Sequence, residues 1–225
     1  SYGRRVRMSH LAVVGSHKVN GEAKLHSELM QQTIFSGFAQ MFPDRFTNVT
    51  NGITVRRWLK QSNPRLSRLL TERLGSAWEN DLEEIERLRW AADDPAFRAL
   101  FRDIKRQNKI ALAEEVDRRT GIDVSVDSLF DVQVKRIHEY KRQLLNILYV
   151  VTRYNRIKAR PEEHWVPRTV MLAGKAAPGY VMAKAIIRLI NNVSTVINQD
   201  PRALTKLKCV FLPDYDVSLA QTIMP

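Results

Sequence analysis

The chain has 225 residues but a single cysteine, Cys209, and it lacks long hydrophobic runs. One thiol cannot form a disulfide within the chain, and its isolation argues against a zinc site built on cysteines. No apolar stretch approaches the roughly 20 residues that cross a bilayer, so we expect no membrane partner and no membrane-spanning segment. Because Cys209 lies in the apolar stretch 206–212, we expect a buried and inert thiol.

Glycine-rich nucleotide motifs are missing as well. Residues 174–179 (GKAAPG) resemble a phosphate loop, but Ala176 stands where the Walker motif needs Ser or Thr, and no glycine lies five residues before Gly174. We therefore expect only a strand-to-helix turn that brings Lys175 near a ligand, with a purely structural turn as the alternative. The histidines form no metal-binding pattern, so no metal site is predicted.

Acidic residues are outnumbered by basic ones, 24 against 36, which gives a net charge of +12. Such an excess is compatible with nucleic acid, anionic membranes or phosphorylated ligands. The basic residues alternate with acidic ones along the predicted helices and form no recognition motif, so we expect no nucleic-acid partner. Residues 1–7 are basic without the apolar core of a signal peptide, and we expect a cytoplasmic location.

The most informative segment is the run VQVKRIHEYKRQ at 132–143. It contains four cations, a histidine and a tyrosine, namely Lys135, Arg136, Lys141, Arg142, His138 and Tyr140. A strand should end and a helix begin here, and the first turn of a helix offers free N–H groups and partial positive charge to an anion. Lysine adds a point charge and arginine a planar fork. The segment predicts a site for phosphate, able to hold two phosphate groups; a solvated basic helix face is the alternative.

Hydrophobic periodicity predicts helices in the first half of the chain, over 23–42, from Asn63-Pro64 to Gly75, over 79–90, and from Asp94-Pro95 to Gly121. After Gly121 strands at 128–137, 169–173 and 208–212 alternate with helices at 140–158 and 180–197. We expect the inward faces of these two helices to carry Leu144, Leu148, Val151 and Tyr154, and Met182, Ile186, Ile190 and Val193. This alternation predicts an α/β fold with a parallel sheet.

Ligands of such sheets bind beyond the carboxyl ends of the strands. Those ends are residues 135–138, 174–179 and 213–216. A three-stranded parallel sheet with both flanks open would expose apolar edges. We therefore expect an incomplete fold, a fragment of a longer protein.

Four segments carry a family resemblance when they are taken together. They are GSHKVNG at 15–21 with LHSE at 25–28, TNGIT at 50–54 with RRW at 56–58, FDVQVKRIHEYKRQ at 130–143, and GKAAPGY at 174–180. In these segments the chain resembles the α-1,4-glucan phosphorylases, which act on glycogen, starch or maltodextrin. The resemblance implies a two-domain GT-B-type glycosyltransferase fold. It implies that residues 1–50 end the N-terminal domain and that 51–225 begin a Rossmann-like, cofactor-binding C-terminal domain.

By resemblance, pyridoxal 5'-phosphate lies in the cleft between the domains of the parent protein. The family transfers the terminal glucose of an α-1,4-glucan to inorganic phosphate, which yields glucose 1-phosphate with the anomer retained. The cofactor acts through its phosphate, beside the substrate phosphate, so two mutually repelling groups must be held together by cations. The parent is expected to be a homodimer.

The same resemblance assigns roles to individual residues. It implies that Arg136 binds the substrate phosphate, that Lys135 lies near both phosphates and that Lys141 pairs with the cofactor phosphate. These three residues are the predicted catalytic set. The glucosyl unit is expected to contact His17, Asn51 and Tyr140, and the cofactor is expected to lie near Trp58 and Tyr215.

The chain departs from the family pattern at three positions. Glu22 replaces a small valine close to the sugar site, and a carboxylate there predicts impaired or altered catalysis in the parent. Val55 replaces a proline, which affects only the stiffness of the loop. Asp216 stands where some members carry an arginine near the cofactor phosphate.

Absent segments matter more than these substitutions. The family's cofactor lysine and its glycine-rich loop for the substrate phosphate are expected beyond Pro225. We therefore expect these residues alone to be inactive although the parent is an enzyme. A non-catalytic module that binds glucan or anions is the alternative.

Overall fold

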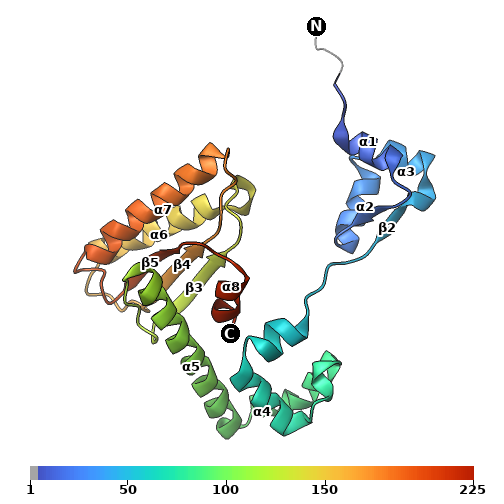
Figure 1. Cartoon of the computed structure of the whole chain (residues 1–225). Helices are drawn as coiled ribbons and strands as arrows, with labels where there is room; N and C mark the ends of the chain where they lie inside the picture. Colours follow the sequence, from blue (N-terminus) through green and yellow to red (C-terminus); the bar gives the residue numbers. More distant parts are fainter. Residues whose placement is uncertain (1–4) are drawn as a thin grey trace. The chain divides into compact units, whose positions relative to one another are not determined.

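The computed structural model describes residues 5–225 and divides the chain into two compact units that meet at Thr54 and Val55 (Figure 1). The first unit contains α1 (Met8–Gly15), β1 (Val19–Gly21), α2 (Lys24–Gln32), α3 (Ser36–Met41), η1 (Pro43–Arg45) and β2 (Phe46–Asn48). β1 and β2 pair in parallel, from Val19 opposite Phe46 to Gly21 opposite Asn48. Each unit is described by itself below.

One long helix over 23–42 was predicted, and this prediction is wrong. The chain leaves the helical conformation at Thr33, where φ is −122° and ψ is −96°, and α3 begins only at Ser36. Thr33 and Ile34 are β-branched and favour helix weakly, and the Thr33 hydroxyl donates to the Leu29 carbonyl at 2.5 Å. This side-chain bond competes with continuation of the helix.

The first unit buries few side chains of its own. Within its described part, Val13 is the only buried apolar residue, while Ile34 and Ile53 are 69% and 78% exposed. The loop after β2 leads from this unit into the second unit. Folding of the first unit therefore rests on little apolar burial.

The second unit starts with helical segments: the π-helix η2 (Arg56–Gln61), α4 (Pro64–Leu74), η3 (Ala77–Glu79), η4 (Leu82–Ala92) and α5 (Pro95–Thr120). The predicted ends of α4 and α5 are confirmed. The Asn63 side chain accepts from Leu66 N at 3.2 Å, and Gly75 with φ +77° follows the last turn of α4. Gly121, in the left-handed conformation, ends α5.

The segment 79–90 was predicted as an amphipathic helix and forms 3-10 turns instead. Asp81 interrupts it, because its side chain accepts from Glu83 N at 3.0 Å and starts η4 anew. Acidic residues three and four apart also repel each other along an α-helix. The nearby core consists of Leu70, Leu74 and Trp78, and Val55 packs against it.

Three parallel strands form the sheet of the second unit in the order β3 (Leu129–Val134), β4 (Arg168–Ala173) and β5 (Leu207–Leu212). The helices α6 (Gln143–Ala159) and α7 (Val181–Gln199) connect them, which confirms the predicted βαβαβ order. One core lies between the sheet and α6 and α7, and a second packs α5 and α8 (Val217–Ile223) on the other face. Cys209 is fully buried in the first core, and burial raises the pKa of its thiol to about 11.

β3 differs from the buried strand predicted over 128–137. It ends at Val134, and Leu129 and Val132 are 48% and 38% exposed. Within the described part of the chain β4 is its only neighbouring strand, and β5 is an edge strand in the same way. β5 is nevertheless buried, because α7 and α5 pack against it, whereas no described helix makes comparable contact with β3. The exposure of β3 therefore follows from what lies alongside it and not from its side chains.

The predicted inward faces of α6 and α7 need correction. Leu144, Leu148 and Met182 are exposed, whereas the buried faces carry Gln143, Ile147, Val150 and Ile157 on α6 and Ala183, Ile186, Ile190, Ser194 and Ile197 on α7. Ile186 and Ile190 confirm part of the prediction. α6 has apolar residues all round its first turns, so periodicity alone cannot select the face that meets the sheet. Among residues 5–225, no helix has the length and apolar character to cross a bilayer.

Candidate functional site

The loops after β3, β4 and β5 lie at one edge of the sheet, because Val134, Ala173 and Leu212 stand in register. Two backbone hydrogen bonds join the first two loops: Lys135 N donates to Ala173 O at 3.1 Å, and Ile137 N donates to Lys175 O at 3.2 Å. We call residues 135–142 the cation loop. It is thus anchored to the turn that begins at Gly174.

Gly174 allows this close approach. Its φ is +153°, and a Cβ atom built on it would lie 2.0 Å from the carbonyl oxygen of Lys135. Any side chain would therefore push the two loops apart or require a different backbone. The glycine is needed for packing between the loops, whether or not the turn also touches a ligand.

Buried amides fix the backbone of the cation loop. Gln143 is fully buried, and its Nε2 donates to Arg136 O at 3.0 Å while its Oε1 accepts from His138 N at 3.3 Å. Gln133 Nε2 donates to Lys141 O at 3.0 Å. Asn146 orients Gln133 by donating to its Oε1 at 2.9 Å. The loop conformation is held by uncharged groups, which leaves its charged side chains available.

Aromatic residues support the middle of the loop. The Tyr180 hydroxyl donates to the Glu139 carboxylate at 2.6 Å and accepts from Glu139 N at 3.2 Å, and the bond to this carboxylate raises the pKa of Tyr180. The ring of His138 lies 4.5 Å from Tyr140 and 5.0 Å from Tyr180, between ring centroids. His138 Nδ1 accepts from Tyr140 N at 3.4 Å. These contacts give His138 a structural role in the loop.

The cations of the edge have no anionic partner among residues 5–225. No ion pair or side-chain hydrogen bond is formed there by Lys135, Arg136, Lys141, Arg142 or Lys175. All are exposed except Lys141, which is half-buried with Nζ 4.8 Å from the centroid of the Tyr140 ring. These cations outnumber the single carboxylate of the loop, Glu139, which is bonded to Tyr180 and not to them, so the local potential is positive and favours an anion. The arrangement suits phosphate groups.

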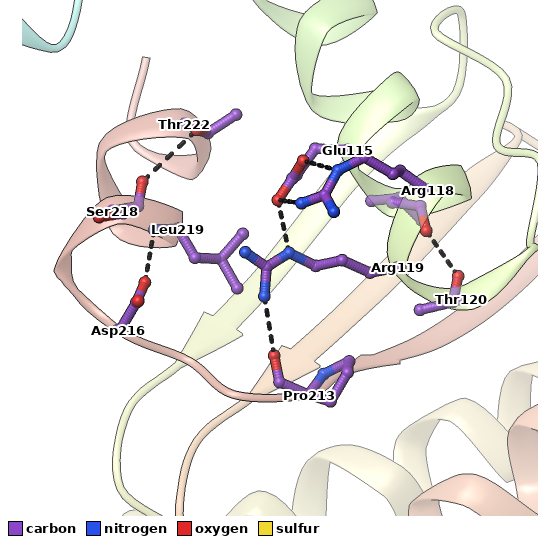
Figure 2. Close-up of polar contacts among 10 residues, drawn as sticks. Glu115, Arg118, Arg119, Thr120, Pro213, Asp216, Ser218, Leu219 and Thr222 are labelled. Carbon is purple, nitrogen blue, oxygen red and sulfur yellow. Dashed lines mark hydrogen bonds and ion pairs between the residues drawn. The ribbon is translucent and has the colours of Figure 1, made fainter.

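The turn between β5 and α8 completes the edge (Figure 2). Arg119 donates to the carbonyl of Pro213 at 3.3 Å, and Asp216 caps α8 by accepting from Leu219 N at 2.8 Å. Glu115 pairs with both Arg118 and Arg119, and the Arg118 hydrogen bond is the main cause that lowers the pKa of Glu115 to about 2. Asp216 therefore has a capping role at the position where the family pattern varies. Tyr215 is half-buried against the core, and burial raises its pKa.

Two predicted sugar contacts lie in the first unit. Asn51 N donates to Glu22 O at 2.9 Å, and Asn20 Oδ1 accepts from Val49 N at 2.7 Å, so the segment that follows β2 adjoins β1 and the residue after it. The structure thus places Asn51 beside Glu22. His17 is exposed two residues before β1.

The structure therefore brings together only part of the predicted site. Lys135, Arg136, Tyr140, Lys141 and Tyr215 belong to the loops at the carboxyl edge of the sheet. Trp58 is half-buried in η2, within the helical part of the second unit, and no contact joins it to the cation loop. His17 and Asn51 belong to the first unit.

Sequence reasoning assigned no role to the residues that shape the cation loop, namely Gln133, Gln143, Asn146 and Tyr180. A signal for one of them was present. Gln143 is a polar residue on the helix face that also carries Ile147 and Val150, and a polar residue in such a place usually satisfies a backbone group. No comparable pattern marks Gln133, Asn146 or Tyr180.

The parallel sheet and the unpaired cations at its carboxyl edge define an α/β protein with a cation-rich sheet edge. The sequence model of the family described as carbohydrate phosphorylase matches residues 1–225, and the chain belongs to this family. This confirms the resemblance drawn from the four segments and the α/β fold class that it implied. Among the described side chains, no cluster of three or more His, Cys, Asp or Glu is placed to hold a metal ion.

Close relatives carry the same family name. The chain is 54% identical over 224 residues to the glycogen phosphorylase of Haemophilus influenzae and 50% identical over 224 residues to that of Chlamydia pneumoniae. It is 49% identical over 222 residues to the muscle form of human glycogen phosphorylase. These alignments cover 99–100% of this chain but only 26–27% of each relative. The chain spans about a quarter of the length of the curated relatives it matches.

Proposed function

We propose that this chain forms the phosphate-holding part of an α-1,4-glucan phosphorylase. The protein would transfer the terminal glucosyl unit of the glucan to inorganic phosphate and release glucose 1-phosphate with the anomer retained. The observation that carries the proposal is the cation loop, whose lysines and arginines form no ion pair among the described residues, in a chain about half identical to glycogen phosphorylases. The first unit would belong to the N-terminal domain and the second to the cofactor-binding domain.

The residues present fit the phosphate of pyridoxal 5'-phosphate. Lys141 and Lys135 have no competing anionic partner among the described residues, so an additional phosphate would relieve their mutual repulsion. Tyr215 and Trp58 would supply half-buried aromatic surface near the cofactor. When bound, this cofactor supplies a phosphate group that can give and take a proton beside the substrate.

The chain's own contribution to the reaction is electrostatic. Arg136 would bind the substrate phosphate through two parallel N–H groups, and Lys135 would reduce the repulsion between the two phosphates. Because Gln143 and Gln133 already hold the backbone of Arg136 and Lys141, little reorganisation is required when charge develops. Preorganisation of this kind accounts for the buried amides.

The glucosyl unit would contact His17, Asn51 and Tyr140. Asn51 is held by the backbone bond to Glu22, and Tyr140 is 69% exposed, so its ring and hydroxyl are available. The partners are then an α-1,4-glucan and inorganic phosphate, with no nucleic acid and no membrane. A cytoplasmic homodimer is part of this proposal.

The test is the formation of glucose 1-phosphate from glycogen and phosphate by the complete protein that carries this chain. Arg136→Ala should lower turnover roughly 100-fold or more, because a donor aimed at developing charge is lost. Arg188→Ala, which removes an exposed arginine from α7, is the matched control and should leave turnover unchanged. Equal activity of the Arg136 variant would contradict the proposed role of the loop.

The alternative is a non-catalytic module that binds glucan or anions. The unpaired cations are consistent with this alternative, because they explain binding of an anion without implying a reaction. Salt-sensitive retention on glycogen without any glucose 1-phosphate formation by the complete protein would support this alternative and exclude phosphorolysis.

A further inference from the structure

A polar groove of about 690 Å³ lies beside β5. Its walls come from the end of α5 (Arg119, Thr120, Gly121, Ile122, Asp123), from α7 (Asn191, Ser194, Thr195, Asn198, Gln199) and from β5 and its following loop (Lys208, Phe211, Pro213). Figure 2 shows Arg119 pointing to the loop that contains Pro213. Its volume falls in the range of small-molecule sites, about 300–1,000 Å³.

The outer edge of β5 is closed to another strand at the centre of this groove. Asn198 Nδ2 donates to Cys209 O at 2.7 Å, and Asn198 Oδ1 accepts from Cys209 N at 3.1 Å. One side-chain amide thus takes the place of a neighbouring strand, a device that blocks edge-to-edge pairing. Leu207 N is also occupied, by Ala203 O at 2.8 Å. A β-strand is therefore not the expected occupant.

Backbone groups remain available farther along the strand. In a parallel ladder the residues alternate in the direction of their N–H and C=O groups. Because Cys209 directs both groups outward to Asn198, Phe211 directs its groups to the same side. The groove therefore offers one backbone donor and one backbone acceptor beside the ring of Phe211.

Three side chains of the groove are also uncommitted. Asp123, Gln199 and Lys208 make no ion pair and no side-chain hydrogen bond within residues 5–225. A carboxylate, an amide and an ammonium together provide acceptors and donors for several hydroxyl groups. The half-buried ring of Phe211 adds an apolar surface of the kind that packs against C–H groups.

The charge of the groove distinguishes it from the cation loop. Among its uncommitted side chains, Lys208 and Asp123 carry opposite charges, while Arg119 shares the Glu115 carboxylate with Arg118. The uncommitted charges of the groove thus balance, and it lacks the cluster of unpaired cations that marks the cation loop. Its ligand should be neutral and rich in hydroxyl groups.

We propose that this groove binds glucosyl units of an α-glucan. Each sugar hydroxyl both donates and accepts, which matches the mixed set of free groups, and the C–H face of the ring matches Phe211. The groove follows the outer strand β5, whereas the cation loop follows β3, so the polymer would gain a second contact. This inference rests on the proposed function, since it assigns the same substrate to another surface.

The experiment compares two variants of the complete protein. The double variant Asp123→Ala with Gln199→Ala removes two free groups of the groove, and Asn192→Ala removes an exposed amide of α7 outside it. Retention on immobilised glycogen is measured, together with the ratio of phosphorolysis of glycogen to that of maltotetraose. Loss of each hydrogen bond should weaken retention by roughly three- to tenfold. The activity ratio should fall in parallel, while Asn192→Ala changes neither quantity.

A second measurement does not depend on turnover. Maltoheptaose should slow hydrogen exchange of the Phe211 amide in the wild-type protein and not in the double variant. The groove proposal would be wrong if the double variant is retained like the wild type and maltoheptaose leaves Phe211 exchange unchanged in the wild type. If the protein still forms glucose 1-phosphate in that case, the proposed function stands. Absence of glucose 1-phosphate formation by the wild-type protein would instead overturn the proposed function.

Discussion

Single uncharged residues decide whether the cations of this chain can act together. Gln143 is the clearest case, because one buried amide holds both the Arg136 carbonyl and the His138 N–H. Replacing it would leave two backbone groups without partners, which costs about 1–3 kcal/mol for each buried group. The cations would attract the ligand, and the amide of Gln143 holds the backbone that carries them.

Gly174 provides a test at this scale. Gly174→Ala should destabilise the protein by about 3 kcal/mol, because φ is +153° and the new Cβ would collide with Lys135 O. Urea unfolding measures the change. Gly179→Ala is the control, since a Cβ there meets no atom within 4 Å, and it should shift the free energy of unfolding by less than about 0.5 kcal/mol. Similar values for both variants would contradict the packing argument.

Glu22 provides a second test. Its backbone carbonyl accepts from Asn51 N, so Glu22 adjoins a predicted sugar contact, at a position where the family resemblance implies valine. In the complete protein, Glu22→Val should raise the rate of phosphorolysis severalfold, because a charge is removed next to the place where the sugar and phosphate react. Initial rates at saturating glycogen check this. An unchanged rate would show that Glu22 does not affect the site.

At the scale of helices and strands, local chemistry predicted the ends of elements better than their faces. Asn63 and Gly75 bound α4, and Asp94 and Gly121 bound α5, as their capping chemistry indicated. The exposed edge of β3 and the buried face of α6 were missed. Those features depend on which element packs alongside. Where apolar side chains lie on several faces of a helix, the sequence does not determine which face is buried.

Glu115 and its two arginine partners on α5 make the stability of the folded protein depend on pH. In the unfolded chain Glu115 has the ordinary pKa of 4.5, and in the folded protein the hydrogen bond from Arg118, aided by Arg119, lowers it to about 2. A lowered carboxyl pKa contributes stability that is fully present above pH 4.5 and is lost as the pH falls toward 2.

Thermal unfolding between pH 5 and pH 2 measures this contribution. Glu115→Gln should lower the melting temperature at pH 5 and reduce its fall on acidification. Glu114→Gln removes a neighbouring exposed carboxylate and should leave the change of melting temperature with pH close to that of the wild type. If the melting temperatures of both variants vary with pH as in the wild type, Glu115 does not make this contribution.

At the scale of the whole chain, apolar burial is distributed unevenly. The first unit buries Val13 among its described residues, while two hydrophobic cores cover the sheet of the second unit. The cations of the predicted site lie in the second unit and two of its sugar contacts in the first. The proposed function therefore draws on residues of both units.

The isolated chain of 225 residues should form no glucose 1-phosphate from glycogen, phosphate and pyridoxal 5'-phosphate. The cofactor lysine of the family has no match among the segments that carry the resemblance, and the cation loop alone supplies binding without the remaining chemistry. A phosphoglucomutase-coupled assay measures this, with the complete protein as positive control. Sustained product formation by the pure chain would contradict the prediction.

Family membership, the parallel βαβαβ order and the clustering of cations at residues 135–142 were readable from residues alone. They depend on short-range patterns: hydrophobic periods, capping residues and clustered charge. The support of the loop by Gln133, Gln143 and Tyr180, the approach permitted by Gly174, and the neutral groove beside β5 depend on contacts between segments far apart in the chain. Only folding brings such segments into contact, so only the tertiary structure could assign them.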